Sequence, residues 1–210
     1  MIKELILTPE ELYYMGRFMQ AKYIDYAYIA AMSDIRQNYA LFEKEAQAAL
    51  VSAGILMEDF SGNVEIDSKA AAVLKPIFFG EVETSVDICY LGETNAVSVN
   101  KFHFYDGAVT MVAGSDGKLI IRSIDKIDIH EFVSGLLSKD FAGKYETVTE
   151  FDKDKITRFI AVKSVDVGKV SVVNTYIESD GAIYHEKGSN IESITRDMFI
   201  EEAYSIVKGV

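Results

Sequence analysis

Apolar and polar residues alternate with a period of two over most of the chain from Val82 onward. Such alternation is typical of strands that have one buried and one exposed face. The first set of predicted strands is Val82–Tyr90, Ala96–Tyr105, Ala108–Ala113 and Lys118–Ile124. The second set is Tyr145–Phe151, Thr157–Val165, Lys169–Glu178 and Ala182–Lys187.

Asp-Gly pairs mark a repeated order of elements within this strand-rich part. Asp116-Gly117 and Asp180-Gly181 are each followed by a short alternating run, a polar connector with a helix cap, and an amphipathic helix. Asp106-Gly107 is typical of a tight hairpin of the primed type, because both residues tolerate positive φ. The repetition predicts two meander-plus-helix units. We expect them to form one broad antiparallel sheet with pseudo-twofold symmetry, in an α+β fold.

Each predicted meander ends in a helix with a definable start. Asp128 and Glu131 have the spacing of a capping box and open the first of these helices. In the second half, the polar connector Gly188-Ser189-Asn190 leads to Ser193 or Thr195 as a cap. Apolar residues at helical spacing then predict a final helix that runs to about Val207.

The N-terminal region also begins with a helix signal. Thr8 can cap the helix, Pro9 suits the first helical position, and Glu11 completes a capping box. Apolar residues at helical spacing follow, weakened at Gly16, and resume from Ala21 to Met32.

Tyrosines crowd this region: Tyr13, Tyr14, Tyr23, Tyr26, Tyr28 and Tyr39. Two interpretations stay open. The tyrosines either pack a helical hairpin against the sheet or form an aromatic contact surface, because Tyr offers a large amphipathic area at low entropic cost.

The next segment has the outline of a winged-helix unit. A helix over Tyr39–Ser52 ends at Gly54, a hairpin covers Phe60–Ile66, and Asp67 or Ser68 caps a helix through Leu74. Residues 38–80 carry three lysines against six acidic residues, a local charge of −3. A surface that binds phosphates needs clustered Lys and Arg. We therefore interpret this segment as a structural or protein-contact module.

Composition narrows the class of protein. The chain has 210 residues and a net charge of −12, which argues against nucleic acid as a partner. We expect a single α+β domain over residues 1–210, with sub-units at 1–80, 81–140 and 141–210. Met1 to Leu7 contain too short an apolar run for a signal peptide, and no stretch approaches the ~20 apolar residues of a membrane-spanning helix. A cytoplasmic protein without membrane insertion is predicted.

The sequence offers no constellation typical of catalysis. His103, His130 and His185 share no ligand spacing with one another or with Cys89, which lies in a strand pattern that favours a structural thiol over a nucleophile. Strands flank the glycines of Gly114–Gly117, whereas a phosphate loop needs a following helix N-terminus. We predict no catalytic, cofactor-binding or metal-binding residue, and a binding protein rather than an enzyme.

Three short apolar stretches, Ala48–Leu56, Gly62–Ile66 and Ala70–Pro76, follow one another along the chain. They predict a helix that ends at Gly54-Ile55, a small hairpin that contains glycine, and a helix that ends at Pro76. In this order they resemble the EspG family, the cytosolic chaperones of type VII (ESX) secretion systems, with Ile55 in the usual Leu position. The likeness continues in order of elements through the first meander and its helix.

The resemblance implies an α+β protein that holds a secreted helical-hairpin protein in the cytoplasm and directs it to the secretion machine. The lysine-rich sequence looks like a relative from a Gram-positive bacterium of low GC content, whose client would be a WXG100-like or LXG-type protein. Family contacts fall on a sheet loop and the C-terminal helix. The candidate partner-binding residues are therefore Gly92, Glu93, Thr94, Asn95, Glu201, Glu202 and Tyr204.

Other functions stay open at this point. An immunity or accessory protein could neutralise a secreted toxin by covering it, and the charge of −12 would suit a basic toxin domain. An enzyme whose site has no sequence signature is a third possibility. Oligomeric state is left open.

Overall fold

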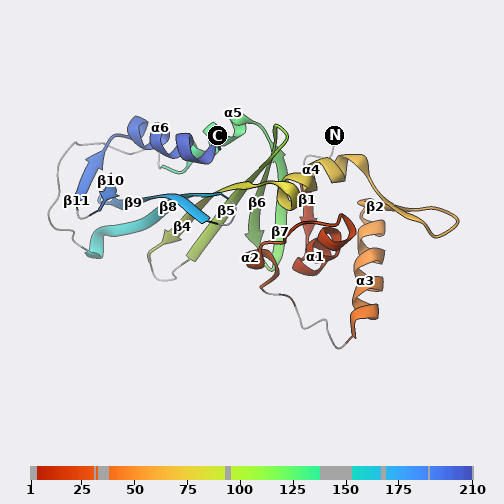
Figure 1. The fold of residues 1–210 in the computed structure, drawn as a ribbon. Helices are drawn as coiled ribbons and strands as arrows, with labels where there is room; N and C mark the ends of the chain where they lie inside the picture. The colour runs from red at the N-terminus through yellow and green to blue at the C-terminus, as the bar shows by residue number, and fades with distance from the viewer. Residues whose placement is uncertain are drawn as a thin grey trace. The chain divides into compact units, whose positions relative to one another are not determined.

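The computed structural model describes residues 4–30, 32, 38–92, 96–137, 153–166, 169–188 and 190–209. They form an α+β protein dominated by one antiparallel sheet of nine strands, as predicted (Figure 1). Its strands are β1 (Glu4–Leu7), β4 (Val82–Tyr90), β5 (Ala96–Tyr105), β6 (Ala108–Ser115), β7 (Lys118–Ile124), β8 (Ile156–Asp166), β9 (Lys169–Ser179), β10 (Ala182–Lys187) and β11 (Asn190–Ile194). A separate two-stranded hairpin pairs β2 (Leu56–Glu58) with β3 (Val64–Ile66).

Six helices and one 3-10 turn accompany the strands in the part of the chain that the structure describes. They are α1 (Pro9–Phe18), α2 (Tyr26–Ile29), α3 (Tyr39–Ser52), α4 (Ser68–Phe79), α5 (Lys126–Gly135), η2 (Lys153–Lys155) and α6 (Arg196–Val207).

The chain divides into two compact units. Unit 1 comprises Met1–Gly80 and His103–Ser123, and unit 2 comprises Glu81–Phe102 and Ile124–Val210, so β5 contributes to both. The organisation as a single α+β domain stays a prediction.

The strand order explains the duplication that the sequence suggested. The order is β1-β7-β6-β5-β4-β8-β9-β10-β11, so the connectivity reads the same outward from the β4–β8 pair. On one side, β4 to β7 form a meander followed by α5. On the other, β8 to β11 form a meander followed by α6. The sheet therefore contains two meander-plus-helix units related by a pseudo-twofold connectivity.

The predicted match between the Asp-Gly turns of the two units is wrong by one hairpin. Asp180-Gly181 joins β9 to β10, so its equivalent is Asp106-Gly107 between β5 and β6, not Asp116-Gly117 between β6 and β7. The error arose at Asn190, which was assigned to a polar connector but begins β11. Strand β11 pairs with β10 through Ile183↔Ile194 and its neighbours. The predicted strand Tyr145–Phe151 lies outside the described residues.

Unit 1 places α1, α3 and α4 around an apolar core with β1, β6 and β7. The capping box at Thr8 and Glu11 is present as predicted: the Glu11 amide donates to Thr8 Oγ1 and the Thr8 amide donates to Glu11 Oε2. The core residues of this unit are Leu5, Leu7, Leu12, Met15, Tyr28, Leu50, Ile55, Leu56, Ala70, Val73, Leu74, Ile77, Phe78, Val112, Leu119 and Ile121.

Three helix predictions need correction. The expected helix from Ala21 to Met32 is only the short α2, because α1 ends at Phe18 and Gln20 adopts a φ of 56°. Pro76 does not close α4, which continues to Phe79 with Pro76 buried inside it. Helix α5 begins three residues early, because Asp125 is the cap and Asp128 takes the N3 position expected for Glu131.

The winged-helix outline is present in unit 1 as α3, the β2–β3 hairpin and α4. The tyrosines of this unit fit neither interpretation alone: some pack in the core and others are exposed as a contact surface would require. Tyr28 is buried, with its hydroxyl 2.5 Å from His103 Nε2, whereas Tyr26 is 74% exposed.

Candidate partner-binding surface

Helix α6 has a buried face and an outer face, both set by its sequence. Thr195 caps its start and accepts a hydrogen bond from the Met198 amide at 3.2 Å. Phe199, Ala203 and Val207 follow at four-residue spacing and are fully buried against the strands of unit 2. This spacing leaves the opposite side of the helix free to face solvent.

Helix α5 lies beside α6 in unit 2 (Figure 1). The Arg196 guanidinium donates a hydrogen bond to the Ser134 carbonyl at 3.0 Å, which ties the start of α6 to α5. Farther along, the ring of His130 meets the ring of Tyr204 edge to face, with centroids 5.3 Å apart and planes at 77°. These contacts fix the two helices side by side.

A groove of about 460 Å³ opens along this pair of helices. Ile200 and Tyr204 contribute apolar area to its lining, which also includes Asp197, Glu201 and His130. Lys208 extends its ammonium to 5.6 Å from the Tyr204 ring, which it meets through a cation–π contact. The groove therefore joins apolar area with negative charge, a combination suited to a helical segment that carries a cation or free amide donors.

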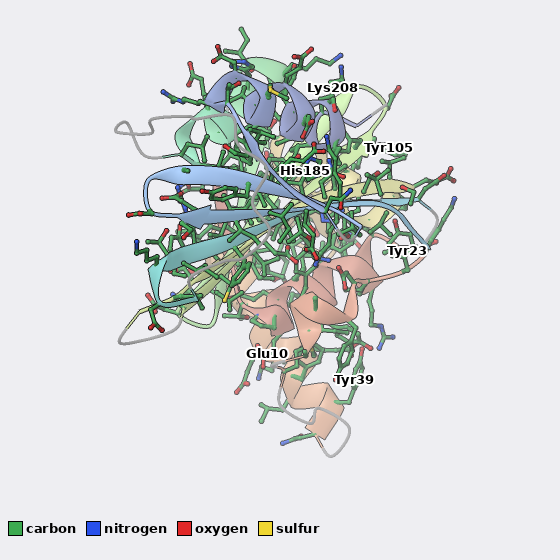
Figure 2. All side chains as sticks on the ribbon, turned by 90° about the vertical axis from the view of Figure 1, so that its left-hand side faces the viewer. Glu10, Tyr23, Tyr39, Tyr105, His185 and Lys208 are labelled. Carbon is green, nitrogen blue, oxygen red and sulfur yellow. The ribbon has the colours of Figure 1, made fainter. Side chains whose placement is uncertain are left out.

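A second polar cluster lies under α6, on its sheet side. The Tyr176 hydroxyl donates to Glu202 Oε2 at 3.2 Å, and the Tyr176 ring lies 4.7 Å from that of His185. His185 Nδ1 is 2.9 Å from the same carboxylate oxygen but lacks the geometry of a hydrogen bond. Figure 2 shows His185 below the helix, whereas Lys208 is at its C-terminal end.

Burial governs the charge states in this cluster. It raises the pKa of the Tyr176 phenol far above its ordinary value, so Tyr176 remains a hydrogen-bond donor. Burial also lowers the pKa of His185, although the Glu202 carboxylate opposes this effect. The imidazole is accordingly biased toward its neutral form.

The structure places the predicted partner-binding residues in three environments. Glu201 and Tyr204 come together in the groove. Glu202 faces the opposite way, toward Tyr176 and His185. Gly92 is exposed after β4, and Glu93, Thr94 and Asn95 lie outside the described residues. Partner binding by any of them stays a prediction.

The prediction from sequence missed His130, Asp197 and Ile200. Asp197 and Glu201 are four residues apart, as are Ile200 and Tyr204, so helical spacing could have revealed both pairs. His130 carried no such signal, because its position depends on how α5 packs against α6.

The histidines have separate surroundings: His103 contacts Tyr28, His130 contacts Tyr204, and His185 contacts Tyr176 and Glu202. Within the described ranges, no group of three potential ligands is placed to hold a metal ion. No described helix is both long and apolar enough to span a membrane. Cys89 is half-buried in β4.

Comparison with known proteins identifies a shared fold. The chain is similar to the type VII secretion system chaperone EspG5 of Mycobacterium tuberculosis, solved in complex with the PE25-PPE41 dimer. The TM-score is 0.65 at 8% sequence identity, and the match covers 98% of this chain and 95% of that chain. No protein-family profile and no curated protein matches the sequence. The chain therefore has an EspG-like fold.

Proposed function

We propose that this protein is a non-enzymatic chaperone or adaptor that binds an α-helical protein destined for type VII secretion. The observation that carries the proposal is the match, over nearly the whole chain, to a chaperone solved with its bound dimer. The groove between α5 and α6 supports it from the chain's own chemistry. The client is a secreted helical hairpin, WXG100-like or LXG-type, held in the cytoplasm.

The groove suits the tip of a helical hairpin. Such a tip exposes apolar side chains together with the unpaired amides at the start of its second helix, where the helix dipole is positive. Ile200 and Tyr204 would cover the apolar side chains. Asp197 and Glu201 would accept hydrogen bonds from the amides or from a cationic side chain. The loop that contains Gly92, Glu93, Thr94 and Asn95 would provide a second contact.

Binding of purified clients tests the proposal. A WXG100-like and an LXG-type protein from the source organism would each be titrated with the wild-type chain and with the double variant Asp197→Lys/Glu201→Lys. We expect the double variant to weaken binding at least ~10-fold, because it reverses the charge of the groove. Glu131→Lys is the matched control, since Glu131 is exposed on α5 outside the groove lining. Failure of both clients to bind the wild type, or equal binding by the double variant, contradicts the proposal.

The acidic lining of the groove would also accommodate a basic toxin domain, so an immunity role remains a second candidate. Co-expression separates the two roles. A chaperone delivers its partner to the medium in active form, whereas an immunity protein keeps the partner inactive.

A further inference from the structure

The β2–β3 hairpin of unit 1 presents an aromatic side chain at its tip. Phe60 is fully exposed, and Figure 1 shows the hairpin reaching away from α3 and α4. Met57, on the same hairpin, is 51% exposed opposite Glu65. Phe60 is the most exposed of the large apolar side chains that the structure describes, and aromatic residues are enriched in the cores of protein interfaces.

The turn that carries Phe60 is held in one shape by Asp59. Asp59 Oδ1 accepts hydrogen bonds from the amides of Ser61 and Asn63 at 2.7 and 2.9 Å, and Oδ2 accepts one from the Asn63 side chain at 2.8 Å. The Gly62 amide donates to the Asp59 carbonyl at 3.0 Å, with Gly62 at a φ of 81°. These bonds lower the pKa of Asp59, the Asn63 side chain having the largest effect. A turn fixed in this way loses little entropy on binding.

The hairpin is anchored to unit 1 at its base. Leu56 is buried at its base, and Val64 and Ile66 pack against the unit 1 core. The Asp67 amide donates to the Ile55 carbonyl at 2.9 Å and closes the base. Because the base anchors the hairpin and the Phe60 side chain is fully exposed, we expect the aromatic ring to contribute little to the stability of this fold.

The charge around the ring restricts the partner. Between Gly54 and Ser68 the acidic residues are Glu58, Asp59, Glu65 and Asp67, with no Lys or Arg, so the segment has a charge of −4. Negative charge repels anionic lipid surfaces and nucleic acid. It attracts a protein surface rich in Lys and Arg.

We propose that this hairpin is a docking pin, in which Phe60 inserts into an apolar pocket of a partner protein rimmed by Lys and Arg side chains. The pin goes beyond the proposed chaperone role, because it is in unit 1 and the groove for the helical client is in unit 2. Asp59 keeps the ring oriented, and the acidic residues on the two strands contact the basic rim.

Site-specific photo-crosslinking identifies the partner. A benzoylphenylalanine residue would replace Phe60 in the full chain, in cells of the source organism. The same residue at Tyr26, another exposed aromatic of unit 1, is the control. We expect a protein that crosslinks at position 60 and not at position 26, through a peptide at an apolar pocket with Lys or Arg around it. No crosslink specific to position 60, or one only to a second copy of this chain, overturns the proposal.

Affinity measurements with the purified partner complete the test. We expect Phe60→Ala to weaken binding ~30-fold or more, as truncation of an aromatic hot spot does. Ser61→Ala, in the same turn, should have no effect, and Glu58→Lys/Glu65→Lys should weaken binding and reduce its salt dependence. Thermal unfolding of Phe60→Ala should match the wild type.

Three results would overturn the proposal at this stage. One is equal affinity of wild type and Phe60→Ala, and another is a large fall in the melting temperature of Phe60→Ala. The third is binding of the chain to phosphatidylglycerol vesicles that disappears with Phe60→Ala, which would make the pin a membrane contact.

Discussion

Helices α4 and α6 each cover strands with an apolar face, but they differ in the polar residues beside that face. Each has twelve residues, covers strands of its own unit, and accepts a hydrogen bond from a buried threonine. Thr110 Oγ1 donates to the Val73 carbonyl of α4 at 2.7 Å, and Thr84 Oγ1 donates to the Val207 carbonyl of α6 at 2.9 Å. The buried residues of α4 are all apolar: Ala70, Val73, Leu74, Pro76, Ile77 and Phe78.

The buried residues of α6, Phe199, Ala203 and Val207, are apolar as well, but this helix also has carboxylates on two further sides. Glu202 faces the sheet, where it meets Tyr176 and His185, and Glu201 faces the groove. The difference indicates distinct roles. Helix α4 completes a core, whereas α6 anchors unit 2 and also lines the groove with Asp197 and Glu201.

Removal of the largest buried ring from each helix should have the largest effect. Phe78 of α4 and Phe199 of α6 are both fully buried. Phe78→Ala and Phe199→Ala should each lower the free energy of unfolding by about 3–5 kcal/mol, because each leaves a cavity. Urea denaturation measures the loss.

The two variants should differ at His185. Phe199 meets Tyr176 edge to face at 4.8 Å, and Tyr176 covers His185. Phe199→Ala should therefore admit water and raise the pKa of His185 toward its ordinary value, whereas Phe78→Ala should not. An NMR titration of the imidazole would detect this. The same His185 pKa in both variants would remove the distinction between the helices.

The sequence predicted most elements of the fold because its local signals are strong. Strand alternation located β4 to β10, and the Thr8 cap located the start of α1. For α6 the sequence offered Ser193 or Thr195, and the structure has Thr195 as the cap. It could not align the repeat, because Asp106, Asp116 and Asp180 adopt nearly the same positive φ of 49° to 52°. Identical turns do not reveal which hairpins are equivalent. Only the strand order does.

Local sequence signals also predicted only some residues of the candidate site. Glu201, Glu202 and Tyr204 were grouped as one surface, but successive helical residues are about 100° apart around the axis. Glu201 and Tyr204, three residues apart, consequently share a face, and Glu202 does not. His130 joins the site only through packing of α5, a tertiary contact with no local signature.

Removal of either threonine hydrogen bond should lower the free energy of unfolding by a smaller amount. Thr84→Val should lower the free energy of unfolding by about 1–3 kcal/mol, because Val207 lies in the last turn of α6, where carbonyls lack an intrahelical partner. Thr110→Val should cost about 0.5–1.5 kcal/mol, since the Val73 carbonyl lies within α4 and can also accept an intrahelical bond. Thermal and urea unfolding would compare the pair. Equal losses would show that the helix position of the carbonyl does not matter.

The smallest effect should be a pH dependence confined to the α6 side. Burial lowers the pKa of His185, Glu202 opposes this effect, and the charges of Lys187 and Glu192 act in opposite directions, with a lowered pKa as the net result. With a folded-state pKa below the ordinary 6.5, the unfolded chain binds the proton first as pH falls. The free energy of unfolding should therefore decrease as pH drops through about 6.5 and level off below the folded-state pKa. Urea denaturation from pH 5 to pH 8 should show this decrease in the wild type, and His185→Gln should lose it. If the free energy of unfolding of His185→Gln depends on pH as that of the wild type does, other groups cause the pH dependence. The comparison between α6 and α4 would then lose this distinction.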